Sequence, residues 1–214
     1  MRIFMGAMVA LLLAGIVGFI GTRPDSVDAA DSGLEAMTKP EYDSRGRLIR
    51  PEGFRRWIFV GASMGLSYSG EERAPEKQIF HHIYIQPEAY DHYVETGKFP
   101  EKTMLVMENY SAGSKENNTA KGKVEGKHEF GTLNGHFEDA RVGLEVALKD
   151  SETFEDGWAY FNFSNFGDRT KLMEKGKAFN KSMCWDCHSE HAADDNVFIQ
   201  FYPVLREHYE ARNK

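Results

Sequence analysis

The two cysteines of this 214-residue chain lie three positions apart, in the sequence Cys184-Trp185-Asp186-Cys187-His188. This is the C-x-x-C-H spacing at which c-type haem is attached covalently. Two thiols on one turn can each add to a haem vinyl group to form a thioether, and the imidazole of the next residue is then within reach of the iron. The sequence therefore predicts a covalently attached haem c, with Cys184 and Cys187 as attachment sites and His188 as the proximal iron ligand.

Three other interpretations of this motif compete with haem attachment. A C-x-x-C redox pair would suit a preceding βαβ pattern, which the sequence does not show. A zinc site could recruit His191, but four ligands within eight residues are unlike the usual paired knuckles. A structural disulfide explains neither the adjacent histidine nor the lack of other cysteines. Haem attachment accounts for all three residues of the motif.

The elements that must position the motif are mostly strands. Short aromatic, β-branched or alternating runs, bounded by glycine or proline, predict strands at 57–62, 79–86, 103–110, 142–148 and 158–163. The chain shows no regular βαβ alternation. We therefore expect an α+β fold, an antiparallel β-sheet with a few packed α-helices.

Two helices and two loops are predicted between and after these strands. Pro87 opens and Gly97 closes a segment that is typical of a short helix. A second helix is expected from Thr170 to Ser182, leading into the haem motif. Glycine, proline and charged residues predict loops at 63–78 and, long and mobile, at 113–135.

The N-terminus is typical of an export signal. Arg2 precedes an apolar run from Ile3 to Ile20, and Ala29 and Ala30 offer a cleavage site. We expect residues 1–29 to be a signal peptide and the protein to be periplasmic, since c-type haem is attached outside the cytoplasm. The apolar run is close to the roughly 20 residues that span a bilayer, so an uncleaved membrane anchor is the alternative.

The rest of the chain is predicted to be one domain with a loose start. Residues 30–50 are polar and mixed in charge and are expected to be a flexible lead-in, followed by a single haem domain over 51–214. A hydrophobic content of 41% is enough for a core. The formal charge of −7, without a basic cluster, speaks against nucleic-acid binding and favours a basic redox partner protein.

The position of the motif narrows the class of cytochrome. No methionine follows Met183, which excludes the small cytochromes c with a downstream methionine ligand, and the strand content argues against a four-helix bundle. Residues 184–206 strongly resemble the cytochrome P-460 family, which includes the β-sheet cytochromes c′-beta. The resemblance extends upstream to about Gly46, through the segments Arg56–Gly61, Ile83–Pro87, Tyr90, Thr96-Gly97, Glu108, Gly143–Glu145, Lys149-Asp150 and Gly157-Trp158. It implies a large antiparallel sheet with the haem packed against it, and a homodimer.

One position departs from the family pattern. In P-460 cytochromes, a lysine on the strand before a glutamate cross-links to the haem ring, and the modified haem oxidises hydroxylamine. Here Met107 stands before Glu108, while Lys98 and Lys102 lie earlier, around the turn. Methionine cannot form that amine linkage, so the resemblance is closer to the c′-beta branch. Met107 is expected in the distal pocket, as a thioether ligand or, as we favour, as an apolar pad.

Two further residues are candidates for the distal side of the iron. His81 shares a strand face with Ile83 and is either a core histidine satisfied by a backbone carbonyl or a polar distal residue. Glu145 is solvent-exposed by pattern alone, whereas the resemblance at Gly143–Glu145 implies a carboxylate near the pocket that could accept a proton. Other aromatic residues are expected to pack around the macrocycle or core, and two histidines to lie at the surface: Phe80, Trp158, Phe161 and Phe163; His191 and His208.

Two functions follow from these predictions. The first is an exported c-type haem protein that binds nitric oxide or another small gas, transfers electrons, or does both. The alternative is a P-460-type oxidase of hydroxylamine or a related nitrogen species, which Met107 places in doubt.

Overall fold

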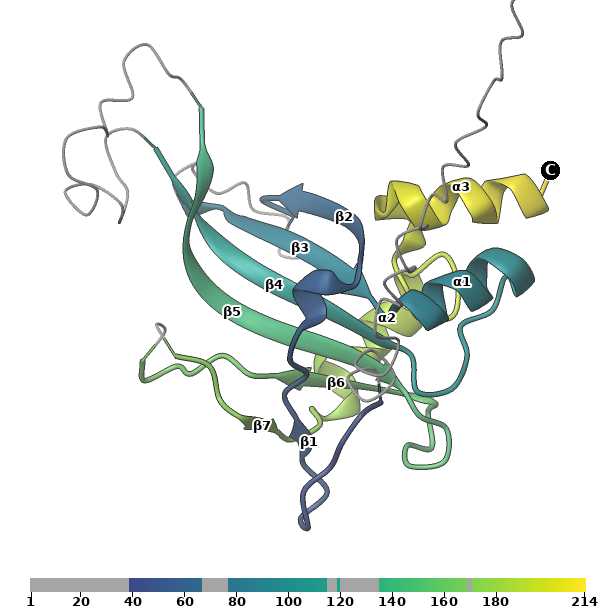
Figure 1. Ribbon diagram of the computed structural model, residues 1–214, viewed down its shortest axis with the longest axis horizontal. Coiled ribbons are helices and arrows are strands. Elements are labelled where there is room, and N and C mark those ends of the chain that lie inside the picture. Colours follow the sequence, from purple (N-terminus) through teal and green to yellow (C-terminus); the bar gives the residue numbers. More distant parts are fainter. Residues whose placement is uncertain (1–38, 67–76, 115–118, 120–134, 169–170) are drawn as a thin grey trace, which may run out of the picture. The chain divides into compact units, whose positions relative to one another are not determined.

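The computed structural model describes residues 39–66, 77–114, 119, 135–168 and 171–214. Five antiparallel strands form one sheet in the order β2-β3-β4-β5-β6 (Figure 1). Since neighbours in the sheet are also neighbours in the chain, the sheet is a meander. Its strands are β2 (Ile58–Met64), β3 (Ile79–Ile85), β4 (Met104–Gly113), β5 (Phe137–Lys149) and β6 (Trp158–Asn162). In the described part of the chain, no helix is long and apolar enough to cross a membrane.

Helices cover one face of this sheet. They are α1 (Pro87–Thr96), α2 (Trp185–His191) and α3 (Pro203–Arg212), and α1 and α3 lie side by side (Figure 1). Their apolar residues join those of the strands in one core, which we call the helix-side core: Val60, Ile83, Ile85, Ala89, Tyr93, Phe99, Leu105, Trp158, Tyr160, Val197, Ile199 and Leu205. An antiparallel sheet with a few packed helices is the predicted α+β fold, which is confirmed.

The opposite face of the sheet is also buried. Leu48 of β1 (Leu48–Ile49), together with Phe54 and Trp57, packs there against Val146 and Phe161 in a second core. Because both faces are covered, alternation along β5 separates two interior faces rather than an interior face from solvent. The pattern-based expectation that Glu145 is solvent-exposed is therefore wrong.

The predicted strands are confirmed, and several are longer than expected. β4 runs on to Gly113, and β5 begins at Phe137 rather than at Val142. The first two residues of the predicted loop at 63–78 belong to β2, and most of the predicted loop at 113–135 lies outside the described residues.

The predicted helix over 87–97 is confirmed as α1. Pro87 is its first residue, where a missing N–H costs nothing, and Gly97 ends it with a φ of 75°. This left-handed conformation is one that glycine adopts without strain.

The helix predicted over Thr170–Ser182 is wrong. From Lys171 to Phe179 the chain runs extended beside β6, where Met173 N donates to Phe163 O (2.7 Å) and Phe179 N to Tyr160 O (2.9 Å). Within this stretch, β7 (Lys175–Gly176) pairs with β1. The unpaired edge of β6 offers backbone groups that need partners, and this demand outweighs local helix propensity. Only the 3₁₀ turn η4 (Lys181–Met183) precedes the motif.

The end of the predicted lead-in is tied to the sheet. Tyr42 Oη donates to Asp150 Oδ2 at 3.0 Å, and Leu48 is fully buried. Residues 1–38, which include the predicted signal peptide, lie outside the described part of the chain.

Candidate haem-binding site

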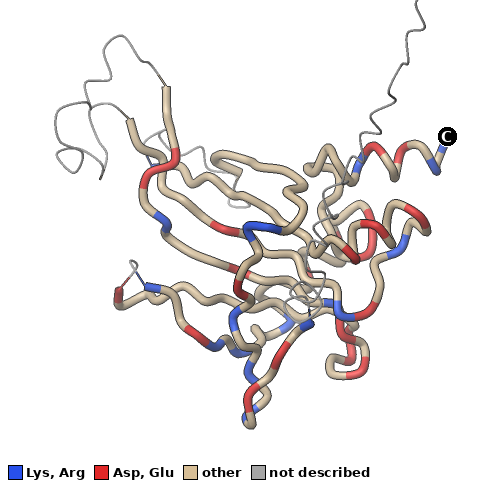
Figure 2. Tube along the Cα trace, in the orientation of Figure 1, with Lys and Arg blue, Asp and Glu red and all other residues tan. Residues whose placement is uncertain are grey.

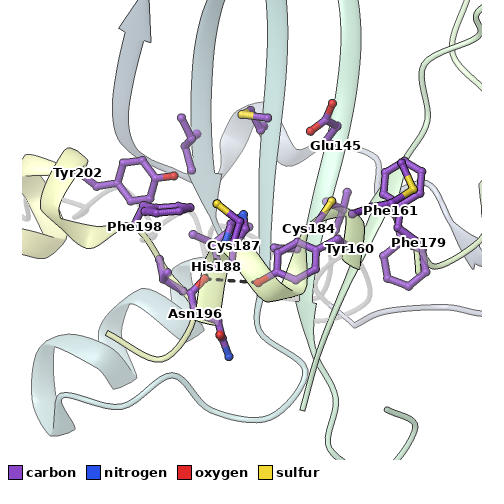
Figure 3. A pocket seen from close by; sticks show the side chains of 17 residues that line it. Glu145, Tyr160, Phe161, Phe179, Cys184, Cys187, His188, Asn196, Phe198 and Tyr202 are labelled. Atoms are coloured by element: carbon purple, nitrogen blue, oxygen red, sulfur yellow. Dashed lines mark hydrogen bonds between the residues drawn. The ribbon is translucent and has the colours of Figure 1, made fainter. Parts of the chain in front are cut away.

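His188 lies in the first turns of α2, with its ring held in one orientation. Its Nδ1 lies 2.8 Å from the backbone oxygen of Asn196 (Figure 3). A carbonyl oxygen only accepts, so Nδ1 carries the proton and donates, and the lone pair of Nε2 is left for a metal. Burial lowers the pKa of His188, which favours the neutral imidazole that ligates iron.

Two aromatic rings enclose this imidazole. The centroid of the Tyr160 ring lies 4.4 Å from that of His188, and the Phe198 centroid lies 4.6 Å from it. Tyr160 comes from β6 and Phe198 from the segment that follows α2. Rings packed at this distance restrict rotation of the imidazole, so the site is preorganised.

The two cysteines lie on the same side as His188. Cys184 is the residue before α2 and Cys187 is within it, so the helical turn brings both thiols towards one cavity (Figure 3). Neither cysteine forms a disulfide. Burial, with a smaller contribution from the charge of Glu145, raises the pKa of the Cys184 thiol to about 11. Both thiols are therefore free and placed for reaction with one group.

The cavity that these residues share has a volume of about 300 Å³ and a mostly apolar lining. Its helix side carries Cys184, Cys187 and His188. Its sheet side is formed by residues of β3, β4 and β5 that face the helix-side core: Ile83, Leu105, Met107, Glu145 and Ala147. An apolar cavity with two thiols and one oriented imidazole fits a covalently held haem.

Strand register places Met107 and Glu145 side by side. Ile83 of β3 pairs with Met107 of β4, which in turn pairs with Glu145 of β5 and, through it, with Asn162 of β6. Residues in one such row project to the same face. Met107 and Glu145 therefore both face the cavity.

Glu145 is a carboxylate in apolar surroundings. Burial raises its pKa. Its Oε1 accepts a hydrogen bond of 3.3 Å from Asn162 Nδ2. The carboxyl group thus lies in the cavity lining, where burial favours its protonated form.

No lysine is among the residues that line the cavity in the described part of the chain. Lys102 instead binds Asp150 through its Nζ at 2.5 Å. Glu108, next to Met107, points to the opposite face, where Arg55 Nε donates to its Oε2 at 3.0 Å. The strand that carries Met107 therefore presents a thioether, and not an amine, to the cavity.

His81 lies one row further along the sheet. It pairs with Asn109, and its Nδ1 lies 2.8 Å from the side-chain oxygen of that residue. Burial lowers the pKa of His81. The residue is not part of the cavity lining, so its geometry agrees better with a satisfied core histidine, although its partner is a side chain rather than a backbone carbonyl.

Of the remaining histidines and aromatic residues that the sequence singled out, Phe161 lines the cavity and the others do not. The His191 side chain is 58% exposed, and among the described residues no group of three or more His, Cys, Asp or Glu is placed to hold a metal ion. His208 contacts Tyr90. Trp158, Phe161 and Phe163 are buried, and of these Phe161 lines the cavity.

Sequence reasoning missed the residues that orient His188. Asn196 and Phe198 lie within the segment that resembles the cytochrome P-460 family, but the sequence predicted no role for either side chain. The one local signal is the Asp194-Asp195-Asn196 run, because Asp and Asn tolerate the left-handed backbone that the turn after α2 requires.

Comparison with known proteins agrees with this site. The family model for cytochrome P460 matches residues 51–199, which include the whole sheet and the C-x-x-C-H motif. No curated protein matches the sequence. The match covers more than half of the chain and the cavity fits a haem, so the chain is a haem protein that belongs to the cytochrome P460 family.

Proposed function

We propose that the chain carries a covalently attached haem c, with Cys184 and Cys187 forming the thioethers and His188 ligating the iron. The convergence of two free thiols and an unprotonated imidazole nitrogen on one cavity supports this proposal. When bound, haem would supply an iron that can take a small ligand and a redox couple for electron transfer.

The proposed ligand is nitric oxide or another small neutral gas. The observation that carries this proposal is the predominantly apolar sheet side of the cavity, where Ile83, Leu105 and Met107 face the helix that bears His188 and Glu145 supplies a single carboxyl group. Water and anions lose hydration without compensation against such a surface, whereas a neutral diatomic molecule loses little. We therefore expect the cavity to favour small neutral gases over water and anions.

Anaerobic titration of the purified ferrous protein with nitric oxide tests this function. We expect a high-spin spectrum that converts to a nitrosyl spectrum, and weak binding of azide and fluoride by the ferric protein. A low-spin, six-coordinate iron that takes up no nitric oxide would contradict the proposal.

A second candidate is oxidation of hydroxylamine, and Glu145 is the observation in its favour. Removal of electrons from hydroxylamine also releases protons, and a carboxylate in the cavity with a raised pKa could accept them. Steady-state assays with an artificial electron acceptor distinguish the two functions. Turnover that falls in the Glu145→Gln variant would support the enzyme, and no turnover by wild-type protein with intact haem would exclude it.

The cellular setting is part of the proposal. We propose export to the periplasm, with residues 1–29 as signal peptide, and a homodimer by family analogy. Positive and negative residues are interspersed along the described chain (Figure 2), and the net charge of −7 favours a basic redox partner. Intact mass of the purified protein tests cleavage and haem addition together, light scattering tests the dimer, and recovery in the membrane fraction would indicate an uncleaved anchor instead.

A further inference from the structure

We propose that Asp195 is a positioning residue for the iron ligand, acting through the turn whose Asn196 carbonyl accepts the hydrogen bond of His188. This inference rests on the proposed function, since it assumes that His188 ligates haem iron. It concerns a side chain that lies outside the cavity and that no sequence pattern singled out for a role.

The Asp195 carboxylate is held by the sheet through both of its oxygens. Trp158 Nε1 donates to Oδ1 at 3.0 Å, and Lys149 Nζ donates to Oδ2 at 2.7 Å. Lys149 and Trp158 are cross-strand partners at the ends of β5 and β6. Lys149 Nζ also donates to Phe99 O at 2.9 Å, so the cation itself is fixed. The carboxylate therefore fastens the turn to a rigid part of the sheet.

The turn needs this fastening because of its backbone conformation. Asp195 has a φ of 42° and Asn196 a φ of 60°, and consecutive left-handed residues other than glycine persist only where their surroundings hold them. On the preceding residue, Asp194 Oδ2 accepts a hydrogen bond of 3.1 Å from Tyr93 Oη. Without the Asp195 anchor, the turn keeps, among the described residues, only the long hydrogen bond of 3.5 Å from Tyr160 Oη to Asn196 O as its side-chain tie to the sheet near His188.

The carbonyl that this turn presents acts directly on the ligand. Asn196 O accepts from His188 Nδ1 at 2.8 Å and lies 3.5 Å from the hydroxyl of Tyr160. A hydrogen bond from Nδ1 to a carbonyl makes the imidazole a stronger donor through Nε2, which favours ferric over ferrous iron. Loosening the turn should weaken this bond and raise the reduction potential of the haem.

The test measures the reduction potential and the iron–histidine stretching band of the ferrous holoprotein. In Asp195→Ala, we expect the ferrous-to-ferric ratio at the wild-type midpoint to rise about threefold to tenfold, or about 28 to 59 mV for one electron. The stretching band should move to lower frequency. Asp195→Asn keeps an acceptor for Trp158 and should show a smaller effect.

Two further variants separate positioning from simple loss of charge. Trp158→Phe keeps the carboxylate but removes its indole donor, and should shift both readouts in the same direction as Asp195→Ala. Glu190→Ala removes an equal charge from an α2 side chain that is 76% exposed, and should leave the stretching band unchanged.

Different results would contradict the proposed haem function and the proposed role of Asp195. A wild-type protein without covalent haem or without histidine ligation would overturn the proposed function. Wild-type histidine ligation together with unshifted bands and potentials in Asp195→Ala and Trp158→Phe would overturn only the role of Asp195. If Asp195→Ala does not fold, as judged by circular dichroism, the Trp158→Phe and Asp195→Asn results decide.

Discussion

At the scale of single residues, the site combines one oriented imidazole, the proposed iron ligand, with two side chains of contrasting chemistry. His188 is fixed by Asn196 and two aromatic rings. On the sheet side, Met107 and Glu145 lie next to each other in one row of the register. One is an apolar thioether and the other an acid, so each can be tested without removing the other.

Met107 is expected to fill space rather than to ligate iron. Met107→Ala should leave the ferrous spin state unchanged and lower the free energy of unfolding by about 1–3 kcal/mol, less on average than the roughly 2–5 kcal/mol for fully buried methionine, because Met107 is half-buried. Optical spectra and urea denaturation measure both effects. Met64→Ala, at a side chain 44% exposed, is the control and should change neither. Conversion of a low-spin to a high-spin spectrum would instead identify Met107 as a ligand.

Glu145 should make the apoprotein less stable as pH rises. Burial raises its folded-state pKa above the unfolded value, so the folded state binds a proton more tightly. The contribution of protonated Glu145 to the free energy of unfolding is fully present below about pH 4, and it is lost as pH rises through the folded-state pKa of Glu145. Urea denaturation should therefore show Glu145→Gln to be more stable than wild type at pH 7 and equal to it at pH 4. Equal stability at both values would mean that the carboxyl is not desolvated.

At the scale of elements, an extended segment supports the sheet where a helix was expected. Residues 171–179 add backbone hydrogen bonds to the outer edge of β6, the strand that carries Tyr160. Because Tyr160 packs on His188, the hydrogen bonds at this edge of β6 also help to hold the His188 ring in place.

Removing one of these hydrogen bonds should destabilise the protein. Met173→Pro deletes the N–H that donates to Phe163 O at 2.7 Å and should cost about 1–3 kcal/mol in chemical denaturation, because the carbonyl loses its partner. Met173→Ala retains the N–H and removes a side chain that is 38% exposed, so it should cost less than about 1 kcal/mol. Similar losses in the two variants would show that the side chain, and not the edge pairing, stabilises this segment.

At the scale of the whole molecule, the cavity makes the fold depend on its cofactor. A cavity of about 300 Å³ within the helix-side core corresponds to at most about 7 kcal/mol at roughly 24 cal/mol per Å³. The Cys184→Ala/Cys187→Ala double variant should lose covalent haem and several kcal/mol of this stability, measured by urea denaturation against the holoprotein. A haem-free variant as stable as the holoprotein would mean that the helix-side core closes without the cofactor.

The sequence by itself determined what depends on short-range order. The Cys184–His188 spacing suits one turn of helix, Pro87 and Gly97 bound a helix, and aromatic, β-branched or alternating runs mark the strands of the sheet. These features need only neighbouring residues, because helices and strands repeat over a few positions. They were enough for the α+β fold, and they carry the prediction of a haem motif.

Only the tertiary structure decided which faces of the sheet are covered and which side chains face each other across the cavity. Alternation groups Glu145 with Ala147 and Lys149 but does not reveal that helices cover that face, so Glu145 was expected in solvent from its pattern. Likewise, register places His81 one row beyond Met107, and the Asn196 carbonyl reaches His188 through a turn that Asp195 fastens to the sheet. Local periodicity specifies which residues share a face, whereas burial and pairing partners come from segments far away in the chain.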